Sequence, residues 1–273
     1  MHYETIINNS IEYTRETFAG HWDRWIILAL LGLPFTLIRF LIDPQKIVTA
    51  AGFQWDLIPW GSIGALVIAG ILASFFIAGY TVRIYRGTWP PPGLTGWASL
   101  FIDGIRLDIV ILVWFLPVII LALLLLVILL GGLFSHGIFP GFSPLVLILS
   151  VGLIFLAGMV LLFIASLYVT MGAIRFARTG SMAEGWRFSA ISALIRRIGW
   201  WNYFIAIVLI GIAALVYSIA MFLPASIPYV GWIVPVGLAP FFTVFVARYY
   251  TLVYETGEER PAAPPAPPGP SGA

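Results

Sequence analysis

The sequence predicts an all-α protein: a polytopic helical membrane bundle of about six transmembrane helices, with amphipathic interfacial helices on the cytoplasmic side. Three observations lead to this fold class. Hydrophobic residues make up 61% of the 273 residues and charged residues only 10%, whereas about a quarter of the residues of a soluble protein are charged. Long apolar stretches occur six times along the chain. The arginines fall almost entirely on every second connection between these stretches.

The six apolar stretches are the predicted membrane spans. At a rise of about 1.5 Å per residue, about 20 helical residues cross a hydrocarbon core of about 30 Å. The first and last stretches are therefore short for a span, and the fourth is long. Tryptophans lie near most of the span ends, as expected for side chains at membrane–water interfaces. The predicted spans are 25–42, 61–82, 109–130, 145–174, 200–223 and 230–247.

The basic residues predict how the chain is threaded. With the amino end in the cytoplasm, twelve arginines fall on segments predicted to be cytoplasmic, and only Arg39 and Lys46 fall outside. Short cytoplasmic loops carry the excess of basic residues in membrane proteins. We therefore expect a multi-pass protein of the cell (cytoplasmic) membrane, with the N and C termini in the cytoplasm.

The segments outside the spans have distinct predicted roles. Residues 1–24 are predicted to form a cytoplasmic amphipathic N-terminal segment that leads into the six-span domain, residues 25–254. Residues 98–108 and 182–198 have apolar side chains at helical spacing opposite polar ones, which is typical of helices that lie in the interface. Residues 255–273 are rich in proline and poor in large apolar side chains, so they are predicted to be a disordered cytoplasmic tail.

Arginine pairs beside the spans are the candidate lipid-headgroup-binding residues. A guanidinium group presents a fork of donors that matches phosphate oxygens, and each basic residue near an anionic leaflet contributes about 1 kcal/mol of attraction. Topology alone also places basic residues at these positions, so both interpretations stay open. Arg39, near the outer end of the first span, is predicted to snorkel to the interface. The candidates are Arg83, Arg86, Arg175, Arg178, Arg196 and Arg197.

Prolines make residues 224–240 the least regular part of the predicted membrane domain. A proline inside a span frees a carbonyl group that neighbouring groups must satisfy. For a small molecule that binds within the bilayer, we expect a site near Pro228, Pro235 and Pro240. The alternative interpretation is ordinary kinking of the helices at these residues.

Four short runs of residues occur in an order that resembles a known family. GYTVRI (79–84) is followed by a proline cluster and then by LFIDGIR (100–106), which opens a span. FARTG (176–180) and IPYVGW (227–232) follow later in the chain. Together the runs resemble DUF4013, a polytopic membrane family of unknown function abundant in methanogenic archaea. The similarity extends over about residues 13–254, and it implies a membrane location and an archaeal setting but no activity.

The chain departs from the pattern of this family in two places. Family members usually carry acidic residues just after the proline cluster, whereas residues 92–102 contain none. Residues 43–60 look like an insertion in the first hairpin. If the acidic segment serves a function shared by the family, this member is expected to lack it.

Composition and motifs argue against several classes of function. The central portions of spans two to six contain no Asp, Glu, Lys, Arg or His, although ion-coupled transport normally needs such residues. The chain has no cysteine, and no motif supplies a nucleophile beside a base or a set of metal ligands. We therefore expect no enzymatic activity, no cofactor and no metal site. The formal net charge of +2, confined to loops beside the spans, favours anionic lipid over nucleic acid.

These observations lead to two functional hypotheses. The first is a non-enzymatic membrane protein that organises lipid or scaffolds a membrane complex through its basic cytoplasmic helices. Its expected partners are the bilayer, anionic headgroups, and either another membrane protein or a second copy of the chain. The alternative is a transporter or channel for a neutral or apolar solute.

Overall fold

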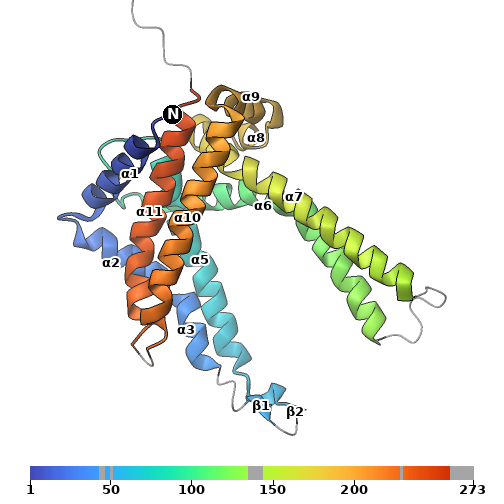
Figure 1. The fold of residues 1–273 in the computed structure, drawn as a ribbon. Helices are drawn as coiled ribbons and strands as arrows, with labels where there is room; N and C mark the ends of the chain where they lie inside the picture. The colour runs from blue at the N-terminus through green and yellow to red at the C-terminus, as the bar shows by residue number, and fades with distance from the viewer. Residues whose placement is uncertain (43–46, 50–51, 135–143, 228–229, 259–273) are drawn as a thin grey trace, which may run out of the picture.

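The structure, a computed structural model, describes residues 1–42, 47–49, 52–134, 144–227 and 230–258. In this part of the chain it contains ten α-helices, one turn of 3-10 helix and a single pair of short antiparallel strands (Figure 1). The predicted all-α class is confirmed. The helices are α1 (Tyr3–Phe18), α2 (Trp22–Leu31), α3 (Leu33–Leu41), α5 (Trp60–Tyr85), α6 (Trp97–Phe134), α7 (Pro144–Thr179), α8 (Met182–Gly185), α9 (Phe188–Ile198), α10 (Trp200–Ala225) and α11 (Ile233–Glu255). The other elements are β1 (Val48–Thr49), β2 (Gly52–Phe53) and η1 (Trp55–Leu57).

Five of the helices, α5, α6, α7, α10 and α11, are each long and apolar enough to cross a membrane, and the pair α2–α3 brings the number to six. The predicted span 25–42, which Pro34 is expected to interrupt, corresponds to the pair α2–α3, between which the chain bends by 43°. Gly32 lies at the bend, and Pro34 occupies the first turn of α3. Proline has no N–H and its ring clashes with the carbonyl four residues earlier, so a continuous helix is disfavoured at this point.

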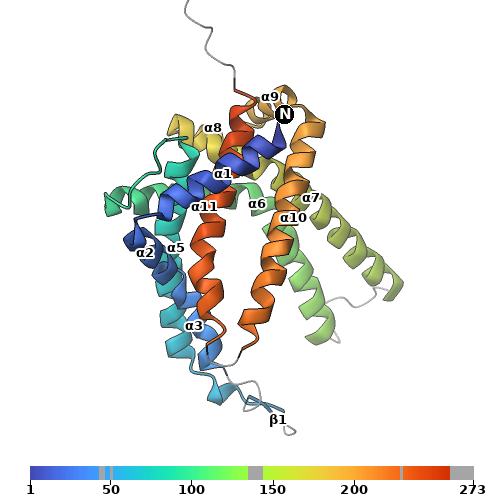
Figure 2. The same ribbon diagram turned by 60° about the vertical axis from the view of Figure 1, so that its left-hand side comes forward.

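The prediction of a surface helix over 98–108 that is separate from the third span is wrong, because these residues form the first turns of the 38-residue helix α6. Figure 2 shows the first part of α6 crossing the bundle before the helix turns to run beside α7. Pro117 lies inside α6 without ending it, and proline is a residue at which a long helix bends. The interfacial segment and the third span are therefore one helix.

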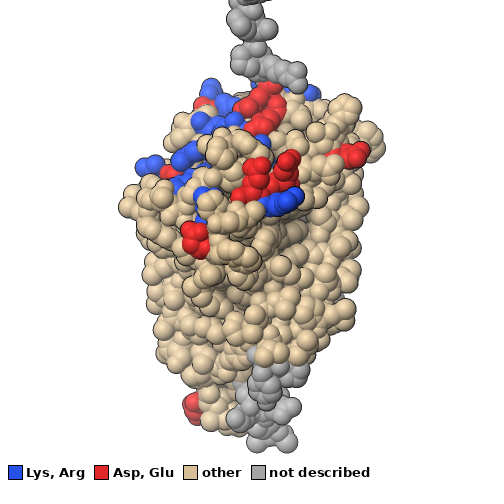
Figure 3. Space-filling model, turned by 90° about the vertical axis from the view of Figure 1, so that its left-hand side faces the viewer, with Lys and Arg blue, Asp and Glu red and all other residues tan. Residues whose placement is uncertain are grey.

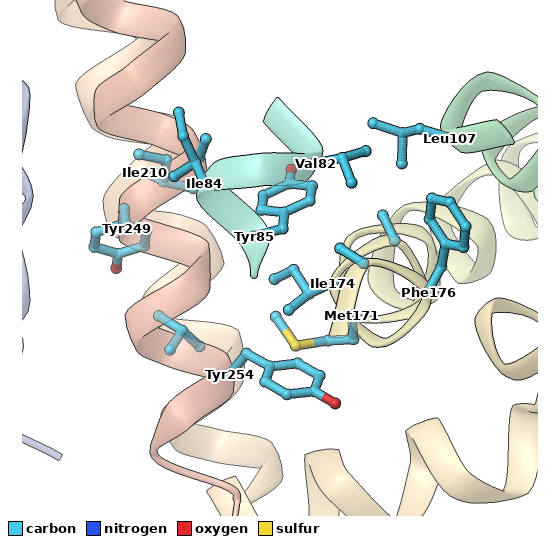
Figure 4. Close-up of a cluster of buried hydrophobic side chains, with 14 of the residues drawn as sticks. Val82, Ile84, Tyr85, Leu107, Met171, Ile174, Phe176, Ile210, Tyr249 and Tyr254 are labelled. Carbon is cyan, nitrogen blue, oxygen red and sulfur yellow. The ribbon is translucent and has the colours of Figure 1, made fainter. Parts of the chain in front are cut away.

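The packed core lies where the helix ends meet, near α1, α8 and α9. Figure 4 shows apolar side chains of α5, α6, α7, α10 and α11 gathered there, among them Ile84, Met171, Ile174 and Tyr249. In contrast, in the most apolar 18-residue stretch of α6 or of α7 only 6% is buried inside the protein, against 39% in the corresponding stretch of α11. Helix α11 is therefore central. The α6–α7 arm, which we define as residues 112–130 and 145–164, leaves the bundle and exposes its apolar side chains (Figure 1).

Two glycines allow α5 and α6 to cross in close contact. A Cβ atom at Gly79 would overlap the backbone carbonyl of Leu100, and a Cβ atom at Gly104 would overlap that of Phe75. Small residues at helix crossings in membranes let the backbones approach in this way. The runs GYTVRI and LFIDGIR therefore pack directly against each other.

Candidate functional site

Charged side chains gather at one end of the molecule. In Figure 3, blue and red atoms cover the upper part of the face shown, and the body below them is almost free of charge. This end carries the N-terminus, α8 and α9, whereas β1 and β2 lie at the opposite end (Figure 1). We call it the charged end, and most of its arginines fall into a paired group and an exposed group.

The first predicted pair, Arg83 and Arg86, binds within the protein. Arg83 Nη1 donates a hydrogen bond to the carbonyl oxygen of Gly93 (2.8 Å), and Arg83 Nη2 donates to Ser99 Oγ (3.0 Å). Arg86 Nη2 forms an ion pair with Asp103 Oδ2 at 2.6 Å. Both arginines extend from the end of α5 to the first turns of α6 or the connection before it. They hold that connection against the helix crossing.

The second predicted pair begins with Arg175, which binds a carboxylate in α8. Arg175 Nε donates to Glu184 Oε2 at 2.9 Å, and the other oxygen of Glu184 accepts a hydrogen bond from Arg187 Nη1 at 2.7 Å. The hydrogen bonds from Arg175 and then from Arg187 lower the pKa of Glu184 below its ordinary value, because they stabilise the ionised carboxylate. The α7–α8 connection is therefore held by a shared carboxylate.

Arg178 joins three helices. Its Nε donates to the backbone oxygen of Tyr85 in α5 at 2.8 Å, and its Nη2 pairs with Glu255 of α11 at 2.5 Å. The guanidinium also packs against Gly87, where a Cβ atom would overlap it. Because three-quarters of the Arg178 side chain is removed from solvent, its main observed role is to bind α5, α7 and α11 together.

The third predicted pair, Arg196 and Arg197, lies exposed on α9. The opposite face of α9 is apolar and buried against the protein core, with Ile191 and Ile195 fully buried. This helix is amphipathic, as predicted, but its apolar face is covered by protein. What it presents outward is a basic face, and within the described residues Arg196 forms no ion pair.

Arg248 is the residue whose environment could not be expected from its position in the sequence. It lies on α11 and is only 8% exposed, with its guanidinium carbon 4.8 Å from the ring centre of Tyr13 and 5.7 Å from that of Trp89. Among the described residues, Arg248 Nε, Arg248 Nη1 and the Tyr13 hydroxyl have no hydrogen-bond partner. Burial raises the pKa of Tyr13 to about 12. The Arg248 guanidinium is thus stabilised by its contacts with the rings of Tyr13 and Trp89.

Two of the three prolines predicted to mark a ligand region, Pro235 and Pro240, line a cavity of about 490 Å³. The third, Pro228, lies outside the described residues. The cavity is bounded by α2–α3, α5, α10 and α11 and is partly open to the outside, and its wall includes Gly32 at the bend between α2 and α3. A volume of this size falls within the range of about 300–1,000 Å³ typical of ligand pockets.

A second hollow of about 620 Å³ lies between α1, α2, α10 and α11. Its lining is aromatic and aliphatic, with Phe18, Trp25 and Phe245 among the residues, and Arg15 on its edge. Trp25 Nε1 donates a hydrogen bond to the backbone oxygen of Gly237 at 2.6 Å, which ties α2 to α11 beside this hollow. Its apolar lining suits hydrocarbon.

Over the described residues, no three His, Cys, Asp or Glu side chains come together in a way that could hold a metal ion. What the described residues offer is a set of arginines at the charged end and apolar hollows beside α11. This arrangement can bind anionic groups and hydrocarbon chains.

Comparison with known proteins gives one match. The model of a family described as "Protein of unknown function (DUF4013)" matches residues 62–226, which is more than half of the chain. The matched region begins in α5 and ends just after α10, so it includes the paired arginines and the α5–α6 crossing. No curated protein and no solved structure matches the chain.

Proposed function

Since the chain belongs to the DUF4013 family, whose description assigns no activity, we propose its function from the geometry of the charged end. We propose a non-enzymatic, multi-pass protein of the cytoplasmic membrane that organises anionic lipid around the exposed arginines of this end. In this proposal the charged end, with both chain termini, faces the cytoplasm. The observation that carries it is the division of the arginines into an internally paired group and an exposed group.

The exposed group contains Arg15 of α1, Arg106 of α6 and Arg196 of α9. In the described part of the chain, none of the three forms an ion pair. At about 1 kcal/mol for each basic residue near an anionic leaflet, their combined attraction is about 3 kcal/mol. Arg83, Arg86, Arg175 and Arg178 are better explained as internal links, because each already donates at least one hydrogen bond to a protein group.

Exposed tryptophans support the proposal that the charged end lies at the level of the lipid headgroups. Trp22, Trp97, Trp200 and Trp201 all lie in the first turn of a helix, and all four are exposed. Tryptophan prefers the level of the headgroups at a membrane interface. A belt of such rings beside the charged end supports a position of the exposed arginines at the headgroup level.

The lipid proposal is tested by counting lipids that stay with the protein. Wild type and a variant with Arg15, Arg106 and Arg196 changed to Gln are reconstituted in an equal mixture of phosphatidylcholine and phosphatidylglycerol, and the lipids retained on purification are identified by mass spectrometry. We expect enrichment of phosphatidylglycerol in the wild type and its loss in the variant. The matched control Arg86→Gln should lower thermal stability while it keeps the enrichment. Equal enrichment in wild type and the triple variant would refute the proposal.

The proposed threading has its own test, which is free of background because the chain contains no cysteine. Cysteine is introduced at Asp56, in η1, or at Thr256, after α11, and intact cells are treated with a maleimide that does not cross membranes. We expect labelling at position 56 and none at position 256 until the cells are opened. The opposite pattern would reverse the threading.

The cavity lined by Pro235 and Pro240 favours a second candidate, a transporter or channel for a neutral or apolar solute. This candidate predicts that a solute changes the accessibility of cysteines introduced at Pro235 or Ala239. Unchanged labelling over a broad panel of neutral solutes would count against it.

A further inference from the structure

We propose that the cavity between α2–α3, α5, α10 and α11 binds an anionic amphiphile with a single apolar chain, whose head pairs with Arg39. This site lies away from the charged end and shares no residue with the exposed arginines described above. The proposal rests on the shape of the cavity, on its lining and on the position of one cation.

The cavity is elongated along the central helix. Its wall follows α11 from Trp232 to Val244, which is a length of about 18 Å at a rise of about 1.5 Å per residue. Tyr80 of α5 lies at the end nearest the charged end, and its hydroxyl is occupied by a hydrogen bond to the backbone oxygen of Pro92. A hollow of this length suits an extended chain better than a compact solute.

Most of the lining is apolar. Leu28, Phe35, Ile77, Val236 and Val244 contribute aliphatic or aromatic surface. The two threonines of the wall, one on α3 and one on α11, each donate their hydroxyl hydrogen to a carbonyl four residues earlier in their own helix. Because these two hydroxyls are already bonded, the threonines offer little to a polar group, and the apolar side chains around them favour hydrocarbon.

Arg39 supplies the single cation of the described lining. It lies in the last turn of α3, at the end of the cavity away from the charged end, together with Trp232. Its guanidinium carbon lies 4.9 Å from the ring centre of Phe40, and among the described residues no carboxylate pairs with it. The Arg39 side chain is exposed and lies at the edge of the cavity, where it can pair with the charged head of a ligand whose chain lies inside.

The pairing of the Arg39 guanidinium with the head of the ligand defines the ligand class. A guanidinium binds a carboxylate or a phosphate through two parallel hydrogen bonds. With the head at Arg39, an apolar chain extends along α11 toward Tyr80. Fatty acids and single-chain lipid phosphates share this combination of anionic head and apolar chain, and the experiment below distinguishes them.

The test measures binding of a fluorescent fatty acid, dansyl-undecanoate, to the protein purified in a non-ionic detergent. We expect saturable binding that palmitate or lysophosphatidate displaces and that hexadecanol, which has the chain without the charge, does not. Stronger displacement by one of the two anions identifies the head. R39Q should raise the Kd at least tenfold, and R39K should raise it less, because the charge remains while the fork is lost.

Cavity-filling variants separate a site from general adsorption. Ala239→Phe narrows the cavity and should abolish saturable binding, whereas Ala122→Phe makes the same change on the exposed surface of the α6–α7 arm and should leave the Kd unchanged. If Ala239→Phe does not fold, Val236→Phe takes its place. Equal displacement by hexadecanol, an unchanged Kd in R39Q, or equal losses in the two alanine variants would each overturn the proposal and leave Arg39 as a snorkelling residue. None of these outcomes affects the test of the charged end.

Discussion

The close crossing of α5 and α6 predicts that the substitution Gly79→Ala lowers the stability of the protein. The new Cβ atom would lie 2.6 Å from the carbonyl carbon of Leu100 and 2.9 Å from its Cα, with the oxygen closer still, whereas ordinary contact begins at 3.4 Å. The carbonyl carbon alone would require a separation of about 0.8 Å, and the closer oxygen requires more; backbone atoms cannot rotate away as side chains do. Overpacking of this kind costs about 1–3 kcal/mol. We expect a value near the upper limit, about 3 kcal/mol, because the links from Arg83 and Arg86 to α6 would also lengthen.

The assay is unfolding of the purified protein in mild detergent, followed by tryptophan fluorescence during heating and during titration with dodecyl sulfate. Gly64→Ala is a matched control on the same helix, because nothing lies within 4 Å of a Cβ atom at Gly64. There the exchange should leave stability unchanged or raise it by up to about 1 kcal/mol, since alanine is the better helix former. If Gly79→Ala unfolds at the same temperature as Gly64→Ala, the close crossing of α5 and α6 is refuted.

Three further predictions concern single side chains near the charged end. The pKa of Glu184 is lowered by its hydrogen bonds with Arg175 and Arg187, so its contribution to stability is present above the ordinary value of 4.5 and is lost as the pH falls through the lower folded pKa. Thermal scans at decreasing pH should show this loss in the wild type and not in Glu184→Gln. Arg248→Met should leave the free energy of unfolding unchanged or raise it by about 1–2 kcal/mol, because a buried cation without an anion gives way to an apolar chain; a decrease of similar size would mean that the cation has a partner. Tyr13→Phe should raise stability by about 1 kcal/mol in the same titration, because it removes a buried hydroxyl with no hydrogen-bond partner within 3.5 Å among the described residues, and a marked destabilisation would mean that the hydroxyl is bonded, for example to Thr88.

The bounds of two long helices could be predicted closely, because a long uninterrupted run of apolar residues favours one continuous helix. The predicted span 200–223 corresponds to α10 (Trp200–Ala225), and 61–82 to α5 (Trp60–Tyr85). The errors arise where an amphipathic segment adjoins a span. Residues 98–108 have a polar stripe typical of an interfacial helix, yet nothing between them and the third span interrupts a helix, so α6 is continuous.

The roles of the arginines could not be predicted, because a guanidinium that pairs with protein and one that faces lipid have the same local sequence. Arg175 and Arg196 both lie near the end of a helix in a basic segment. The structure places Glu184 beside Arg175, and it leaves Arg196 exposed. Arg248 looks like another basic residue after a span, but α1 folds over it and buries it against Tyr13.

The order of apolar and basic segments determined by itself that this is an all-α membrane protein, and it determined the approximate position of each span, because the cost of leaving apolar surface in water or charge in lipid depends on local composition. Only the tertiary structure decided which arginines are internal, where α5 and α6 touch, and that α2–α3, α5, α10 and α11 border a cavity lined in part by Arg39. These features depend on atoms brought together from helices far apart in the chain, and no local pattern of residues records such distances.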